Sequence, residues 1–283
     1  MISWLVDRFF IKKPALRRAI TRWLERDEDL LLDLFGSRLC VNSIKEHGYL
    51  RTYRRTRWSS LLRDEMAVIV NLALLMEDGD TFVDVGANVG VFTCLLARAG
   101  LLAGRSHRFY AFEANPDTYA RLLRSIGDLP VSARQVAASD REGLLTFVPG
   151  AVSHVFTAVE CANDYNFRDA VTTVRSERLD AAGIVGDSLI IKIDVEGQEK
   201  AVLDGAAGLF EANRVKAVYV DGYKELAVED LLRHWGMVLL NGRTLRPAEP
   251  NVQTLLGIKA LPARCLVPHP EAGAETSGCC PPR

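Results

Sequence analysis

Residues 81–93, TFVDVGANVGVFT, join an apolar strand-like run to the start of a helix-like run. Asp84, Gly86, Asn88 and Gly90 interrupt what would otherwise be a buried strand. Glycine at such a junction permits backbone conformations that other residues rarely adopt, and the helix that follows begins with free amide groups. The stretch therefore predicts a strand, a tight turn and a helix whose N-terminus faces a ligand. The simpler alternative is a glycine turn in which Asp84 caps the helix.

The alternation that begins here continues along the chain and predicts the fold. Seven strand-like runs follow residue 80, most of them separated by enough residues for a crossover helix: TFVDVG, HRFYAFE, VSARQVAAS, SLIIKIDV, VKAVYVD, GMVLL and QTLLGIKA. This pattern predicts an α/β fold with a mainly parallel, Rossmann-like sheet and helices on both faces. Between residues 143 and 174 strand-like pieces occur without a helix, which predicts an insertion at the sheet rim, placed to shape a pocket.

Three segments are predicted along the chain. Residues 1–60 are expected to be a helical and irregular N-terminal segment. Residues 61–262 form the main domain, beginning with a helix that should end at Asp78-Gly79. Residues 263–283 are rich in Pro, Gly and small polar residues, a composition that predicts a disordered tail.

Composition excludes some classes of function. The chain has 283 residues, 48% of them hydrophobic, enough for one large core. It holds 35 Lys and Arg against 36 Asp and Glu, so its net charge gives no global reason to expect a nucleic acid partner. The six cysteines show neither CxxC spacing nor His-rich clustering. We therefore expect neither a zinc site nor a disulfide scaffold, and a cytoplasmic location.

The N-terminus, MISWLVDRFFIKKPALRR, lacks the order of a secretory signal because Asp7 and Arg8 interrupt its apolar stretch. No apolar run reaches the roughly 18 residues of a membrane span. The mixture of aromatic and basic residues would suit peripheral contact with an anionic membrane. An amphipathic helix docked on the domain explains the same residues, and both interpretations stay open.

The residues around the turn indicate an adenosine-type ligand. GANVG lacks both the GxGxxG trio and the GK[ST] signature of phosphate-binding loops. A carboxylate at Asp84 would repel a pyrophosphate and suits a ligand with a cationic end. Glu113 stands 23 positions beyond Gly90, where an acid could accept hydrogen bonds from both ribose hydroxyls. Taken alone, Glu113 would more often be a charge at the start of a helix.

Two further stretches place polar residues at the same edge of the sheet. Ser139 and Asp140 end the third strand, where they could bond an adenine amino group or simply form a turn. Lys192, Asp194 and Glu196 alternate along a buried run and so point to one face. Because buried charges are costly, they either form a structural network or serve a ligand.

Four motifs, VDVGANVGVFT, FEANP, AASDREG and IIKIDVEGQEKAVLDGA, resemble in order and spacing the FkbM-type methyltransferases, a branch of the class I S-adenosylmethionine-dependent enzymes. The resemblance covers roughly residues 65–260 and implies a seven-stranded sheet whose last strand is antiparallel. It implies S-adenosylmethionine as the cofactor. The implied cofactor-binding residues are Asp84, Gly86, Ala87, Asn88, Gly90, Thr93, Glu113, Ala114, Ser139, Asp140 and Asp194. The chain departs from the family at Asp221, where a Glu is frequent.

The resemblance also implies an activity: O-methylation of a hydroxyl on a small-molecule or glycan acceptor, such as a sugar or secondary metabolite. Asp194 and Glu196, with Lys192 beside them, are the implied catalytic residues, either carboxylate serving as general base. His154 is a weaker candidate. A Mg²⁺ ion held by Asp194, Glu196 and Asp221 is an open variant.

Two other functions stay in competition. YLRTYRRTRW, residues 49–58, interleaves arginines with aromatics as single-stranded nucleic acid binders do, which would suit an RNA methyltransferase. The nearly neutral charge argues against it. A non-catalytic cofactor-binding protein is the other alternative, and the intact Asp84, Glu113 and Asp194 argue against that. The sequence leaves the oligomeric state open.

Overall fold

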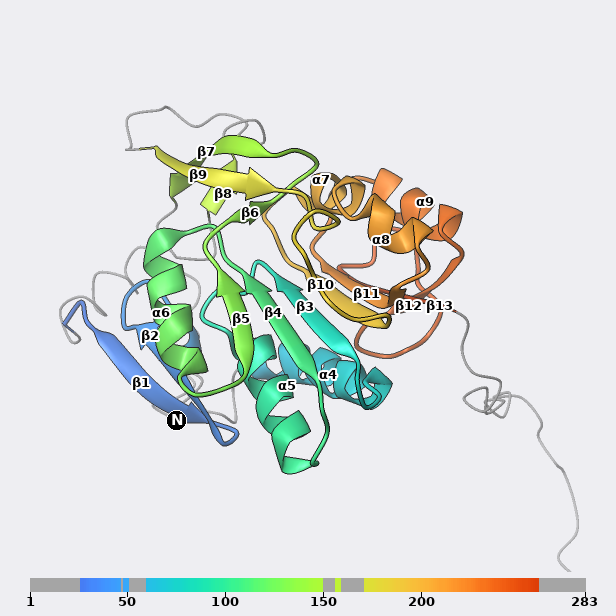
Figure 1. Cartoon of the computed structure of the whole chain (residues 1–283). Helices are drawn as coiled ribbons and strands as arrows, with labels where there is room; N and C mark the ends of the chain where they lie inside the picture. The colour runs from blue at the N-terminus through green and yellow to red at the C-terminus, as the bar shows by residue number, and fades with distance from the viewer. Residues whose placement is uncertain (1–25, 47, 51–59, 150–155, 159–170, 260–283) are drawn as a thin grey trace, which may run out of the picture.

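A seven-stranded sheet organises the molecule (Figure 1). The computed structural model describes residues 26–46, 48–50, 60–149, 156–158 and 171–259. The strand order is β12-β13-β11-β10-β3-β4-β5. All strands are parallel except β13, which runs antiparallel to both of its neighbours. The α/β class and the antiparallel last strand are thereby confirmed. The strands are β3 (Thr81–Val85), β4 (Arg108–Phe112), β5 (Val131–Arg134), β10 (Leu189–Ile193), β11 (Val215–Asp221), β12 (Met237–Asn241) and β13 (Thr254–Lys259).

Helices cover both faces of this sheet (Figure 1). On one face lie α4 (Ser60–Leu75), α5 (Val91–Leu102) and α6 (Pro116–Ile126). On the other lie α7 (Glu199–Asp204), α8 (Ala207–Glu211) and α9 (Ala227–His234). Successive side chains of a strand point to opposite faces, so Phe82 packs with the first layer while Val83 packs with the second. Both residues are fully buried, which explains the uninterrupted apolar runs of the sequence.

The predicted rim insertion forms a second, four-stranded sheet of order β6-β9-β7-β8. Its strands are β6 (Ala137–Ala138), β7 (Gly143–Pro149), β8 (Phe156–Ala158) and β9 (Thr172–Glu177). The run VSARQVAAS therefore contributes to two sheets, because β5 ends at Arg134 and β6 pairs with β9. This change of sheet carries the chain over the carboxyl ends of the central strands.

The prediction of a helical or irregular segment before residue 60 is wrong for residues 29–42. There β1 (Asp29–Leu34) and β2 (Ser37–Asn42) form an antiparallel hairpin. Phe35 and Gly36 make its two-residue turn, both with positive φ (50° and 77°), as a type I′ turn requires. One face of the hairpin joins the core beside α5 and α6, which is why its buried residues alternate along β1.

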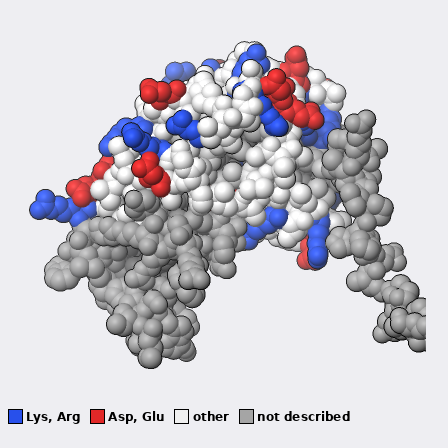
Figure 2. Space-filling view, turned by 90° about the horizontal axis from the view of Figure 1, so that it is seen from below, with Lys and Arg blue, Asp and Glu red and all other residues white. Residues whose placement is uncertain are grey.

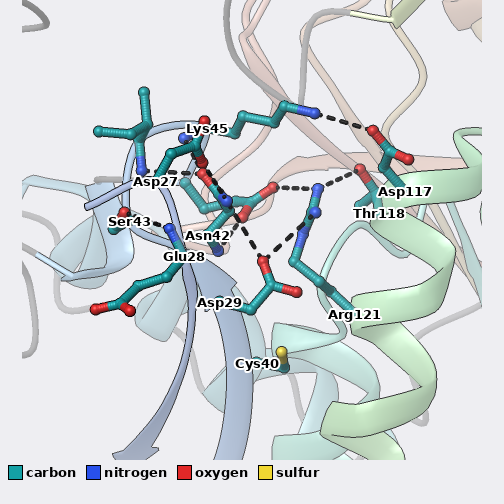
Figure 3. A network of polar contacts seen from close by, with 12 residues as sticks. Asp27, Glu28, Asp29, Cys40, Asn42, Ser43, Lys45, Asp117, Thr118 and Arg121 are labelled. Atoms are coloured by element: carbon teal, nitrogen blue, oxygen red, sulfur yellow. Dashed lines mark hydrogen bonds and ion pairs between the residues drawn. The ribbon is translucent and has the colours of Figure 1, made fainter. Parts of the chain in front are cut away.

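A polar network fixes this hairpin and the turn after it to α6 (Figure 3). Arg121 on α6 lies 2.9 Å from Glu46, and both side chains are almost completely buried. Asp29 lies 3.8 Å from Arg121 and 2.9 Å from Arg124. Lys45 reaches Asp117 at the start of α6, at 2.9 Å. Residues 26–46 are thus packed against α5 and α6, while a domain boundary near residue 60 stays a prediction.

The helix predicted before Asp78-Gly79 is present as α4. α4 ends at Leu75, before the predicted stop, and Gly79 has φ +87°. No helix within the described ranges has the length and apolarity to cross a membrane. The membrane prediction for residues 1–18 and the predicted tail fall outside the described residues.

Candidate functional site

A cleft of about 720 Å³, its open mouth included, lies beyond the carboxyl ends of β3, β4 and β10, the region where open parallel sheets bind ligands. One wall comes from the rim sheet. The residues that line the cleft are Val85, Gly86, Asn88, Phe112, Glu113, Ala114, Val136, Ala137, Ala138, Leu145, Phe147, Asp194, Val195, Glu196 and Gln198. Of the residues singled out in the sequence, the structure brings together Gly86, Asn88, Glu113, Ala114, Asp194 and Glu196.

Close packing explains why the turn after β3 contains glycines. Gly86 has φ +74°, and a Cβ on it would lie 1.9 Å from the carbonyl oxygen of Asp194. Gly90 has φ +90°, and a Cβ there would lie 2.7 Å from Leu122 on α6. Asn88 between them also has positive φ, 52°. Gly86 therefore shapes the cleft directly, whereas Gly90 packs α5 against α6.

Asp84 lies beneath the cleft and does not line it. Its carboxylate is fully buried and accepts a hydrogen bond of 2.6 Å from Thr93 on α5. Lys192 on the neighbouring strand lies 3.0 Å from the other carboxylate oxygen and donates to the carbonyl of Gly86 at 2.7 Å. Burial lowers the pKa of Lys192, but Asp84 and Asp194 outweigh it and leave that pKa raised, so the ammonium stays charged. The cleft is thus not lined by Asp84, Thr93 or Lys192. These side chains act on it indirectly, by supporting the backbone of the turn.

Glu113, at the end of β4, is the buried acid of the cleft. Its two carboxylate oxygens accept the backbone N–H groups of Asn88 and Asn115, each at 2.8 Å. Burial raises the pKa of Glu113 to about 7, although these two hydrogen bonds oppose the rise. A carboxylate has about four acceptor positions, so the remaining ones are available to hydroxyl donors.

Ser139 and Asp140 do not line the cleft, where the sequence placed an adenine contact. Ser139 is buried and donates to Asp140 at 3.1 Å. A Cβ at Gly205 would lie 1.9 Å from the carbonyl of Ser139, so this segment is packed against the end of α7. The cleft is instead walled by apolar side chains that sequence reasoning missed: Phe112, Val136, Ala137, Ala138, Leu145 and Phe147. The only feature of the sequence that pointed to this apolar wall was the predicted rim insertion.

Ala87, which the sequence also predicted in the site, is buried and does not line the cleft.

Acidic side chains gather at the mouth. Asp194 follows β10, has 47% of its side chain exposed and lies 3.6 Å from Lys192. Glu196 lines the cleft two residues later. Asp221 ends the adjacent strand β11, and burial followed by repulsion from Asp194 raises its pKa to about 6. Within the described residues no three His, Cys, Asp or Glu side chains are grouped to hold a metal ion, so Asp194, Glu196 and Asp221 do not form the Mg²⁺ site considered above.

Two candidates from the sequence fall outside the described residues: His154, and residues 51–58 of the arginine-rich stretch. Tyr49, at the start of that stretch, is described and packs at the edge of the core.

A mostly parallel seven-stranded sheet, with a glycine turn after β3 and a buried acid at the end of β4, is a Rossmann-like arrangement with a ligand site beyond the carboxyl ends of its strands. The methyltransferase FkbM domain model matches residues 84–238, more than half of the chain. The chain therefore belongs to the FkbM methyltransferase family and is an S-adenosylmethionine-dependent methyltransferase.

Similar proteins are methyltransferases as well. Hexuronic acid methyltransferase AglP from Haloferax volcanii is 27% identical over 182 residues, covering 63% of this chain and 67% of the relative. A TehB-like methyltransferase from Corynebacterium glutamicum is 9% identical, with a TM-score of 0.39, 76% of this chain and 99% of that chain covered. The sugar N-methyltransferase KedS8 from Streptoalloteichus sp. is 10% identical, with a TM-score of 0.36, 75% and 92% covered.

The residues of the cleft fit S-adenosylmethionine. The apolar walls of the cleft suit an adenine ring, and Glu113 retains acceptor positions for ribose hydroxyls. The Asn88 side-chain oxygen is buried and has no hydrogen-bond partner within the described part of the chain. Such an oxygen can accept a hydrogen bond from an ammonium group, which the methionine end of the cofactor carries.

Proposed function

We propose that this enzyme transfers a methyl group from S-adenosylmethionine to a hydroxyl of a glycan or secondary metabolite. The observation that carries the proposal is the pair of carboxylates, Asp194 and Glu196, at the open mouth of the cofactor cleft. A hydroxyl must lose its proton when it is methylated, and a carboxylate at this place can accept its hydrogen bond.

The cofactor-binding residues are proposed from the same geometry. Gly86 and Asn88 hold the methionine end, Glu113 accepts from the ribose, and Ala114 with the rim sheet covers the adenine. Asp84, Lys192 and Thr93 support the turn from below. Lys192 is therefore proposed to position the backbone rather than to touch the acceptor.

Bound S-adenosylmethionine supplies an activated methyl group. The work of the protein is to place the acceptor oxygen in line behind that group, since correct positioning alone can supply about 7 to 11 kcal/mol of barrier reduction. Asp194 and Glu196 orient the acceptor by accepting from its hydroxyls.

A sugar-like acceptor is supported by the relative from Haloferax volcanii, whose name gives hexuronic acid as its substrate. The nearly neutral net charge, with 35 Lys and Arg against 36 Asp and Glu, favours a small acceptor over RNA. On the face in Figure 2, Lys and Arg of the described residues lie interspersed with Asp and Glu. RNA methylation therefore ranks second.

The test is transfer of a radioactive methyl group to a panel of acceptors: glucuronate glycosides, neutral hexose glycosides, phenolic polyketides and total RNA. We expect the label on a hydroxyl group of an acceptor from one of the first three classes. Treatment with base or with an esterase should not release the label as methanol, because a methyl ether resists both whereas a methyl ester does not. Asp194→Asn should reduce transfer more than cofactor binding. Asp230→Asn, which changes an exposed side chain on α9, serves as the matched control. Label on RNA alone would replace the proposal, and cofactor binding without transfer to any acceptor would favour the interaction protein.

A further inference from the structure

Strand register places Asp221 beside the mouth of the cleft. Across the sheet, Asp84 of β3 pairs with Lys192 of β10, which pairs with Tyr219 of β11. Two residues further along each strand stand Gly86, Asp194 and Asp221. Side chains two apart in a strand share a face, so Asp221 points to the same face as Tyr219 and lies next to Asp194.

The position of Asp221 relative to the cofactor follows from strand order. Glu113 ends β4, and the sheet continues β3, β10, β11 from there. With the ribose at Glu113 and the methionine end at Gly86, the acceptor enters beyond β10. Asp221 then stands on the acceptor side, while the ribose site at the end of β4 lies three strands away.

The surroundings of Asp221 suit a group that takes up a proton. One carboxylate oxygen, Oδ1, is buried with no hydrogen-bond partner within the described residues. Hydrogen bonding with Tyr219 lowers the pKa of Asp221, and the Tyr219 ring is stacked on Phe92 at 6.1 Å between centroids. The charged groups around it are Asp194 and Lys192 from β10 and Arg243 from the turn after β12.

From this juxtaposition we propose that Asp221 is the general base of the transfer reaction. The inference rests on the proposed hydroxyl acceptor. As the acceptor oxygen forms its bond to the methyl carbon, the carbon–sulfur bond breaks and its electron pair stays on sulfur. The hydroxyl proton passes to the Asp221 carboxylate and from there to solvent. Asp194, exposed and paired with Lys192, orients the hydroxyl.

The balance of charges supports this assignment. Burial and the neighbouring Asp194 raise the pKa of Asp221, whereas Tyr219, Lys192 and Arg243 lower it, and the result is about 6. A base with that pKa is ionised at neutral pH and binds a proton more readily than an ordinary aspartate.

The first experiment needs no acceptor. Carbon-13 NMR of the full chain with labelled aspartate, assigned by the signal lost in Asp221→Asn, should show Asp221 titrating near pH 6. Titration below pH 4.5 would overturn the proposal. S-Adenosylhomocysteine should bind Asp221→Asn within twofold of wild type, and a tenfold loss would place Asp221 in the cofactor site instead.

The second experiment uses the acceptor that turns over in the panel above. Asp221→Asn should lose kcat by about 100-fold or more, and Asp221→Glu should recover most of it. Tyr219→Phe keeps the ring stack but removes a hydrogen bond that lowers the pKa of Asp221, so the acidic limb of its kcat profile should move to higher pH. Asp230→Asn should leave rate and profile unchanged.

The outcomes separate the two proposals. Turnover by wild type with a normal rate and profile in Asp221→Asn would overturn the general base and leave the function intact. No turnover on any hydroxyl would overturn the function, and with it the role of Asp221.

Discussion

Glu113 should make the protein less stable as pH rises, and Glu113→Gln should remove that dependence. The side chain is buried and accepts two backbone N–H groups. Its folded pKa of about 7 stands above the ordinary value of 4.5. The native state therefore holds this proton more tightly than the unfolded chain does. Stability contributed by the proton is present below pH 4.5 and is lost as pH rises through 7.

The size of the effect follows from the shift. One pKa unit corresponds to 1.36 kcal/mol, so a shift from 4.5 to about 7 amounts to on the order of 3 kcal/mol of unfolding free energy. Glu199 is also buried, with its pKa raised to about 7 chiefly by burial, and contributes in the same direction. Since Glu199 is present in both proteins, the difference between wild type and Glu113→Gln isolates Glu113.

The assay is urea denaturation of both proteins at half-unit steps from pH 4.5 to 8.5, without cofactor. Gln costs one hydrogen bond at every pH, because its amide nitrogen must face a backbone N–H. The wild type should nevertheless lose about 3 kcal/mol relative to the variant across the range. Parallel curves would refute the reasoning, since they would show that Glu113 titrates normally.

Two further predictions concern the turn and its support. Gly86→Ala should destabilise the protein by several kcal/mol more than Gly79→Ala in denaturant titrations. Both glycines have positive φ, but only at Gly86 does the added Cβ meet a backbone atom within 2 Å. Equal losses in the two variants would show that the backbone at Asp194 can move away without cost. Lys192→Met should cost about 3 to 5 kcal/mol, since it leaves Asp84 buried and unpaired, and adding Asp84→Asn should recover part of that loss. A loss below about 1 kcal/mol, or no recovery, would contradict the buried pair.

The sequence predicted the features that are set by residues close together in the chain. The seven central strands follow from their apolar runs, and the turn follows from Gly86 and Gly90. Membership of the family followed from motifs spaced along the chain. Each of these patterns is set by residues close together in sequence, where periodicity is informative.

What the sequence could not give is the direction of side chains relative to a cleft built by distant segments. Asp84 lies beneath the cleft because Lys192, far along the chain, pairs with it. Ser139 lies behind the cleft wall because Gly205 packs against it. The hairpin of residues 29–42 was missed because successive leucines suit a helix as well as a strand. Its register depends on the Phe35-Gly36 turn and on partners such as Arg121 (Figure 3).

The central claim is that this cleft binds S-adenosylmethionine through Glu113. The most direct test is isothermal titration of S-adenosylhomocysteine into wild type, Glu113→Ala and, as a matched control, Glu211→Ala on the exposed surface of α8. The account predicts saturable binding to wild type and the control, weakened at least tenfold in Glu113→Ala. Equal affinity in all three proteins, or no binding to wild type, would contradict it.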